Sequence, residues 1–250
     1  MARKRKKSSA RRRSASIERI IGTIRHLLTA LGIGVVLLAV VMVRTDPASF
    51  GVGAEGESWL EVLDPRPRGP RIGVIAGHWQ SDSGAVCPDG LQEVDITLAV
   101  ARQVVAMLRE RGFVAEVLPE YSRKLDGYRA AAMVSLHADS CVDHVSGYKV
   151  AAREGRPEAE RDRLLVECLN REYGRVTGLP RHDLSITEDM TQYHAFRVIA
   201  TETPAAIIEL GFMGGDRELL TTKQNLVAQG VVDGVLLFVA ACDKEASPTD

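Results

Sequence analysis

The chain has 250 residues, enough for one domain of ordinary size with accessory segments, and its formal net charge is only −1. That balance hides an asymmetry, because the first 25 residues carry ten Lys or Arg and a single acid, Glu18. The remaining 22 basic and 32 acidic residues give 26–250 a net charge of −10, which argues against a domain that binds nucleic acid through its own basic surface.

The N-terminal part of the chain has the layout of a membrane anchor. Residues 1–26 are rich in Lys, Arg and Ser, a composition that predicts a disordered tail. Residues 27–43 form an uncharged apolar run that reaches about 25 Å as a helix, slightly short of a bilayer core of about 30 Å. Flanking Arg side chains can extend to the headgroups, so this run is predicted to be one transmembrane helix. The positive-inside rule then places 1–26 in the cytoplasm and the rest of the chain outside.

Two other interpretations of the apolar run were weighed. A cleaved signal peptide has the same order of parts, but its basic region is usually shorter, and no convincing small-x-small cleavage site follows Val43. A buried core helix would be flanked by recognisable domain sequence, and this run is not. The anchor is therefore preferred. Residues 44–70 are rich in Gly and Pro and are predicted to be a linker, and 244–250 a polar tail.

Compact patterning fills residues 71–243, where short apolar runs alternate with segments of helical periodicity. Helices are predicted over 94–111, 157–173 and 223–241. Strands are predicted over 71–76, 113–118, 131–136, 146–152, 196–200 and 205–210. This alternation predicts an α/β fold: a single three-layer domain with a mostly parallel or mixed central sheet flanked by helices.

Four ionisable residues stand at or near the ends of predicted strands: His78, Glu93, His137 and Glu209. Strand ends meet at one edge of an α/β sheet, where clefts form. Two imidazoles and a carboxylate suit a catalytic zinc, and a second carboxylate suits a general base. Taken singly, each His or helix-start Glu also has an ordinary structural explanation. Glu209 is harder to explain as a purely structural residue, because a carboxylate within an apolar strand requires a partner.

Four motifs in order point to a known family. They are IGVIAGH, EVDITLA, SLHAD and TPAAIIELGF. On these motifs residues 71–241 resemble the zinc-dependent N-acetylmuramoyl-L-alanine amidases of family 3. The resemblance implies that His78, Glu93 and His137 bind Zn²⁺ and that Glu209 is the catalytic acid/base. The implied reaction is hydrolysis of the amide bond between N-acetylmuramic acid and the L-alanine of the stem peptide in peptidoglycan.

Two residues depart from the family pattern. Trp79 follows the first histidine, where family members usually continue with glycines, and it is interpreted either as a platform for a sugar ring or as a cover over the cleft. Asp139 stands where the family usually has Asn. An extra carboxylate beside the metal is expected either to bind an outer-shell group or to weaken substrate binding.

Two cysteines are placed close together if both histidines bind one metal. Cys87 follows His78 by nine residues, and Cys141 follows His137 by four. In an oxidising compartment a Cys87–Cys141 disulfide that steadies the rim of the site is expected. The alternative, a cysteine as zinc ligand, is less favoured because the three predicted ligands already fill the site.

The preferred hypothesis is an active peptidoglycan amidase held in the bacterial cell membrane with its domain outside the cytoplasm. Three alternatives remain open: a catalytically weak amidase-like domain that binds peptidoglycan, another zinc peptidase that acts on wall peptides, and a purely structural anchored domain. An unregulated wall hydrolase endangers its own cell, so an activator protein is expected, although no residue identifies it.

Overall fold

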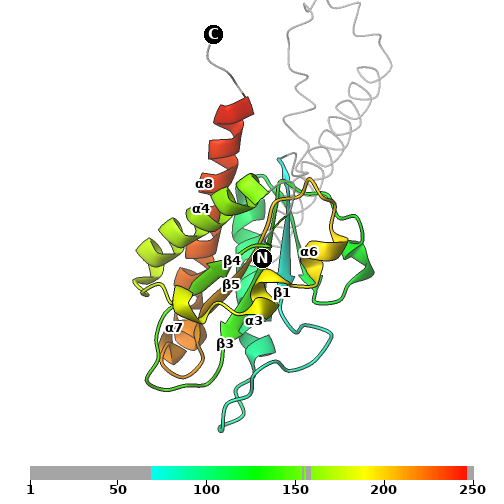
Figure 1. Cartoon of the computed structure of the whole chain (residues 1–250). Helices are drawn as coiled ribbons and strands as arrows, with labels where there is room; N and C mark the ends of the chain where they lie inside the picture. Colours follow the sequence, from blue (N-terminus) through cyan, green and yellow to red (C-terminus); the bar gives the residue numbers. More distant parts are fainter. Residues whose placement is uncertain (1–68, 154, 156–158, 247–250) are drawn as a thin grey trace, which may run out of the picture. The chain divides into compact units, whose positions relative to one another are not determined.

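A mixed five-stranded sheet organises the residues that the computed structural model describes, which are 69–153, 155 and 159–246 (Figure 1). The strands lie in the order β2-β1-β3-β5-β4, and only β4 runs antiparallel to its neighbour. Their bounds are Arg71–Ala76 (β1), Val114–Pro119 (β2), Ala132–Asp139 (β3), Lys149–Ala151 (β4) and Ala205–Phe212 (β5). The predicted single α/β domain with a mixed sheet is confirmed.

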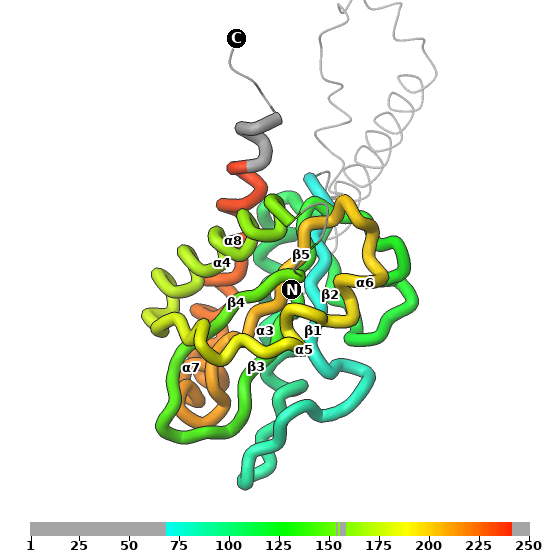
Figure 2. The backbone as a smooth tube through the Cα atoms, in the orientation of Figure 1, coloured from blue at the N-terminus to red at the C-terminus, as the bar shows by residue number. Residues whose placement is uncertain are grey.

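Three long helices cover one face of this sheet. They are α3 (Glu93–Glu110), α4 (Ala159–Thr177) and α8 (Gln224–Ala246), and α8 packs against both α3 and α4 (Figure 1). The other face carries only short elements, which Figure 2 shows as a winding path: η2 (Arg123–Leu125), η3 (Asp183–Ser185), α5 (Glu188–Thr191) and α6 (Ala195–Val198). A further helix, α7 (Arg217–Thr222), directly precedes α8.

Strand alternation separates two apolar cores. Val74 of β1 is fully buried in the core under the long helices, whereas its neighbour Ile75 is fully buried in the core under the short elements. In β3, Met133 faces the second core, and the side chain of His137, four residues later, points to the same face of the sheet. Glu209 of β5 is paired in register with His137. The two ionisable side chains therefore project from neighbouring strands toward the face with the short helices.

One segment of the described residues, Gln224–Ala241 within α8, is long and apolar enough to cross a bilayer. Its side chains Val227, Val231 and Val235 are fully buried in the first core, as expected for the inner stripe of a core helix. The predicted transmembrane helix, residues 27–43, lies outside the described residues, as do the basic N-terminal tail, 1–26, and most of the linker, 44–70.

Two predicted strands differ in the structure. Residues 196–200 lie in α6 and the segment directly after it, where Phe196 and Ile199, three residues apart, are both buried in the second core. The strand prediction was wrong because so short an apolar run does not distinguish a helix from a strand. The predicted strand 146–152 is only Lys149–Ala151. Its beginning is diverted because the Asp216 carboxylate accepts hydrogen bonds from the Ser146 hydroxyl and the Gly147 amide.

Candidate active site

Three of the predicted site residues converge at the carboxyl ends of β1 and β3. His78 follows β1, His137 lies in β3, and Glu93 begins α3. One nitrogen of each imidazole and one carboxylate oxygen lie within 4.8 Å of one another. Glu93 Oε1 is 3.2 Å from His78 Nε2 and 3.1 Å from His137 Nδ1, so this oxygen is shared between the two rings.

The backbone around His78 is specialised for this convergence. His78 has φ 67°, a left-handed conformation that is uncommon for residues other than glycine. Its ring is oriented by Asp82, whose Oδ1 lies 2.5 Å from Nδ1. Nε2 is therefore left facing Glu93. Strain of this kind persists where the surrounding structure holds it, and it is concentrated at functional sites.

Two glycines permit the close approach of the three side chains. A Cβ on Gly77 would lie 2.6 Å from both His137 Cε1 and the Leu136 carbonyl oxygen. A Cβ on Gly84, which also has φ +61°, would lie 2.5 Å from Glu93 Oε2 and 2.7 Å from His78 Cδ2. The Gly-His pair of the first motif is thus explained by packing, since the His137 ring lies where a side chain at 77 would be.

The cluster has the chemistry and spacing of a zinc site. Two donors at about 2.0–2.1 Å from a tetrahedral ion lie roughly 3.3 Å apart, and the separations of Glu93 Oε1 from the two imidazole nitrogens, 3.2 and 3.1 Å, fit that value. Two imidazoles and one carboxylate are also a usual ligand set for catalytic zinc. Glu209 Oε2 is buried without a hydrogen-bond partner, as expected of a group that serves the surroundings of a ligand.

The pKa shifts of the cluster residues indicate a negative potential at this site. The hydrogen bond to Glu93 raises the pKa of His78 to about 9, against the opposing effect of burial. Burial disfavours the charged form of Glu93, but hydrogen bonds with His137 and His78 outweigh it and lower the pKa of this carboxyl. An environment that holds an anion and favours protons on the imidazoles also attracts a metal cation that competes for the same nitrogens.

Glu209 differs from Glu93 in its environment. It is paired in register with His137, and burial raises its pKa to about 7, with a smaller opposing effect from the positive charge of His137. A carboxyl with a pKa near neutrality can both accept and donate a proton at physiological pH. The residue predicted as the acid/base thus lies beside the cluster in the protonation range that such a role requires.

Glu120 is a residue of the site that the sequence reasoning did not identify. It directly follows β2, its side chain is 5% exposed, and its Oε2 accepts a hydrogen bond from the His78 amide at 2.9 Å. Burial opposes its ionisation, but the hydrogen bond with His194 helps to lower the pKa of Glu120. Its position in the sequence could have identified it, because Glu120 directly follows an apolar strand, as His78 does.

Asp139 is not an isolated carboxylate beside the cluster. Its Oδ2 lies 2.6 Å from Nζ of Lys149, a buried residue of β4. Lys149 also donates to the carbonyl oxygen and the hydroxyl of Ser185, at 2.8 and 3.0 Å. The negative charge that the departure from the family pattern adds at 139 is therefore matched by a neighbouring cation.

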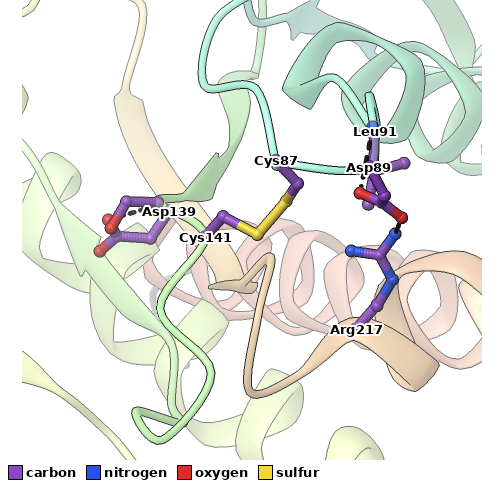
Figure 3. Close-up of a disulfide and its surroundings, with 7 residues drawn as sticks. Cys87, Asp89, Leu91, Asp139, Cys141 and Arg217 are labelled. Carbon is purple, nitrogen blue, oxygen red and sulfur yellow. Dashed lines mark hydrogen bonds and ion pairs between the residues drawn. A yellow bond between two sulfur atoms is a disulfide. The ribbon is translucent and has the colours of Figure 1, made fainter.

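A disulfide joins the two loops that frame the site. Cys87 and Cys141 are bonded, and Figure 3 shows the bridge between the loop that leads into α3 and the loop that leaves β3. Nearby, the Arg217 guanidinium donates to the Asp89 carboxylate, which ties the first loop to α7. The loops that precede Glu93 and follow His137 are thus linked covalently, and neither cysteine is available as a metal ligand.

The aromatic rings of Trp79 and His194 belong to residues next to the cluster or to Glu120. Trp79 is partly buried and packs against the first core, and its carbonyl oxygen accepts from the Glu120 amide. His194 lies 2.8 Å from Glu120 Oε1 through Nε2 and stacks on the exposed ring of Tyr121. A sugar-binding role for Trp79 stays a prediction.

Comparison with known proteins agrees with this geometry. The family model described as N-acetylmuramoyl-L-alanine amidase matches residues 72–236. The protein YqiI of Bacillus subtilis (strain 168) is 31% identical over 181 residues, which cover 67% of this chain and 84% of YqiI.

Solved amidases have a similar fold. Ami1 from Mycobacterium smegmatis is 16% identical, with a TM-score of 0.59 over 70% of this chain and 99% of that one. The CwlD amidase from Clostridioides difficile, solved in complex with the GerS lipoprotein, is 19% identical, with a TM-score of 0.55 over 69% of this chain and 99% of that one. The fold is therefore shared across nearly the whole of both solved domains.

Proposed function

Because the chain belongs to the N-acetylmuramoyl-L-alanine amidase family, we propose that it hydrolyses the amide bond between N-acetylmuramic acid and the L-alanine of the stem peptide in peptidoglycan. The observation that carries this proposal is the placement of Glu209, a half-buried residue with a buried Oε2 and a pKa of about 7, beside the cluster of His78, Glu93 and His137. A proton-transfer group next to three metal-type donors is the arrangement that metal-assisted hydrolysis requires.

The residues have distinct roles in this proposal. His78 Nε2, Glu93 Oε1 and His137 Nδ1 hold Zn²⁺, which when bound supplies Lewis-acid polarisation of a carbonyl and activation of water. Glu209 takes the proton of the attacking water and delivers it to the nitrogen of the departing L-alanine. Its burial keeps the carboxyl poorly solvated, so that its proton affinity is high enough to accept and low enough to release.

We further propose that this reaction takes place outside the cytoplasm, at the cell membrane. The support comes from the sequence of residues 1–43, a basic tail followed by an apolar run, and from the location of peptidoglycan. A disulfide at the rim of the site suits an oxidising compartment. A regulatory protein partner remains an expectation, and the CwlD amidase, which was solved with the GerS lipoprotein, is an example of a family member in a complex.

The test uses the full-length protein in detergent, loaded with zinc and incubated with isolated peptidoglycan, with released fragments identified by mass spectrometry. Wild type should release intact stem peptides that begin with L-alanine. Glu209→Gln should reduce release by at least about 100-fold, because the proton-transfer group is lost. Glu218→Gln, at an exposed position of α7, is the matched control and should retain activity.

Other products would identify other functions. Shortened stem peptides would indicate a peptidase. Binding of peptidoglycan by a zinc-loaded protein without any release would contradict an enzyme that is active on its own, and would point to the amidase-like binding domain or to an enzyme that requires an activator. Loss of release in the chelator-treated protein, restored by added zinc, is the further result expected for the amidase.

A further inference from the structure

The carboxylate of Glu120 contacts or faces both histidines of the candidate metal site. Its Oε2 accepts a hydrogen bond from the backbone amide of His78 at 2.9 Å. The same oxygen lies 3.7 Å from Nε2 of His137, a nitrogen that is buried and has no hydrogen-bond partner. One carboxylate thus touches the first ligand through its backbone and faces the second through its ring.

Its other oxygen is held by the short elements on the same face of the sheet. Oε1 accepts a hydrogen bond from the Tyr193 hydroxyl at 2.9 Å and lies 2.8 Å from His194 Nε2. The Tyr193 hydroxyl in turn accepts from Ser135 of β3, two residues before His137. The carboxylate is therefore fixed from two sides, and its position is set by β1, β3 and the segment before α6.

The two nitrogens of His137 have different surroundings. Nδ1 faces Glu93, and it is the nitrogen available to a metal in the cluster. A neutral imidazole that binds metal through one nitrogen carries its proton on the other, and that N–H is usually directed to a carboxylate or carbonyl. Nε2 faces the Glu120 carboxylate at 3.7 Å, beyond hydrogen-bond distance, and the negative charge there favours a proton on Nε2, which leaves Nδ1 free to bind the ion.

The hydrogen bond to His78 acts on the other ligand. His78 has a left-handed backbone conformation, which is strained for a residue with a side chain and requires compensation. A hydrogen bond from its amide to an ionised carboxylate is stronger than one to a neutral acceptor. Glu120 thereby stabilises the backbone geometry that turns the His78 ring toward Glu93 and His137.

From these contacts we propose that Glu120 is a positioning residue for the metal site, which sets the tautomer of His137 and the backbone of His78 without itself binding the ion. The inference rests on the proposed zinc site, but it does not depend on which bond the protein hydrolyses. Outer carboxylates of this kind typically contribute about 10- to 100-fold to metal affinity. Tyr193 and His194 act on the metal site indirectly, because they hold the Glu120 carboxylate in place.

The test measures the dissociation constant for Zn²⁺ in the full-length protein by competition with a chromogenic chelator, in the absence of peptidoglycan. Glu120→Gln should weaken binding by about 10- to 100-fold, and Tyr193→Phe by a smaller factor. The matched control is Glu116→Gln on the same strand β2, whose carboxylate bonds Tyr128, Arg71 and Lys124 instead. It should keep the wild-type constant.

Two more readouts separate positioning from folding and from direct ligation. Circular dichroism of the metal-free variants reports the fold, and if Glu120→Gln does not fold, Tyr193→Phe and His194→Gln still test the network. At saturation, Glu120→Gln should bind one zinc per chain, and its Co²⁺ form should keep an intense tetrahedral spectrum with shifted band positions. Zinc binding within twofold of wild type in every variant would overturn the proposal, and so would loss of the ion at saturation.

If wild-type protein binds zinc but releases no stem peptide, the proposed amidase activity is contradicted. The positioning role of Glu120 still stands in that case, provided that its variants weaken zinc binding. Conversely, an active amidase whose Glu120→Gln variant binds zinc normally would contradict only the positioning role. The two failures are thus distinguishable.

Discussion

Lys149 Nζ lies 2.6 Å from Asp139 Oδ2, a pairing that reaches from the end of β3 to the edge strand β4 across the intervening strand β5. Lys149 is also paired in register with Glu209, so an opposite pair of charges lies near the predicted acid/base. The two charges have opposing effects on the pKa of Glu209, and both are smaller than the effect of burial.

Asp139→Asn, which restores the residue usual in the family, should lower the free energy of unfolding by about 1–3 kcal/mol, because the buried Lys149 cation loses the carboxylate at 2.6 Å and keeps its hydrogen bonds to the neutral oxygens of Ser185. Urea unfolding measures the change. Asp89→Asn, at the exposed pair with Arg217, is the matched control and should cost less than about 1 kcal/mol. Equal costs at the two positions would contradict the assignment.

Gly77→Ala should weaken zinc binding by more than tenfold and lower the free energy of unfolding by about 1–3 kcal/mol, because the new methyl group overlaps the His137 ring and the Leu136 carbonyl oxygen. Chelator competition and urea unfolding measure both effects. Gly90→Ala, where φ is +91° and no atom lies within 4 Å of the added Cβ, should cost stability through backbone strain and leave zinc affinity unchanged. Unaltered zinc binding in Gly77→Ala would contradict the packing argument.

Replacing both Cys87 and Cys141 with Ser should lower the free energy of unfolding by about 2–4 kcal/mol, because the cross-link spans 54 residues and restricts the unfolded chain. Thermal unfolding with and without a reductant measures this effect. Reduction should destabilise wild type and leave the double variant unchanged. A reductant effect of the same size on both proteins would show that the stabilisation does not come from this bond.

In the metal-free protein, Glu209→Gln should alter how stability depends on pH. Burial raises the pKa of Glu209 from 4.5 to about 7, so the folded state holds this proton more tightly than the unfolded chain. The corresponding stability is fully present below pH 4.5 and is lost as the pH rises through 7. The difference between wild type and Glu209→Gln should therefore grow in favour of the variant, by up to about 3 kcal/mol at pH 8.

Urea unfolding at pH 4.5, 6 and 8 in a chelator checks this dependence. Taking the difference between the two proteins removes the contribution of His78, whose pKa is also raised and which titrates in both. Glu218→Gln, on the exposed surface, should not reproduce the effect. A difference that is constant with pH would contradict the raised pKa.

Much of the fold followed from local patterns. The strand at Arg71–Ala76 and helix α3 were predicted to within one residue, because each has a single strong periodicity and a glycine just beyond its end. The prediction of a strand over 196–200 is wrong, since a five-residue run with four apolar residues fits either a strand edge or one helical turn. Its state depends on the core surface that Phe196 meets.

The sequence by itself determined the α/β class and the family, and it pointed to the four side chains His78, Glu93, His137 and Glu209, because these depend on residue type, order and spacing along the chain. Only the tertiary structure showed that Glu120 joins them and that Lys149 neutralises Asp139. The physical reason is that both relationships are made between residues on different strands, where the register of the sheet and the burial of each charge decide which partners meet.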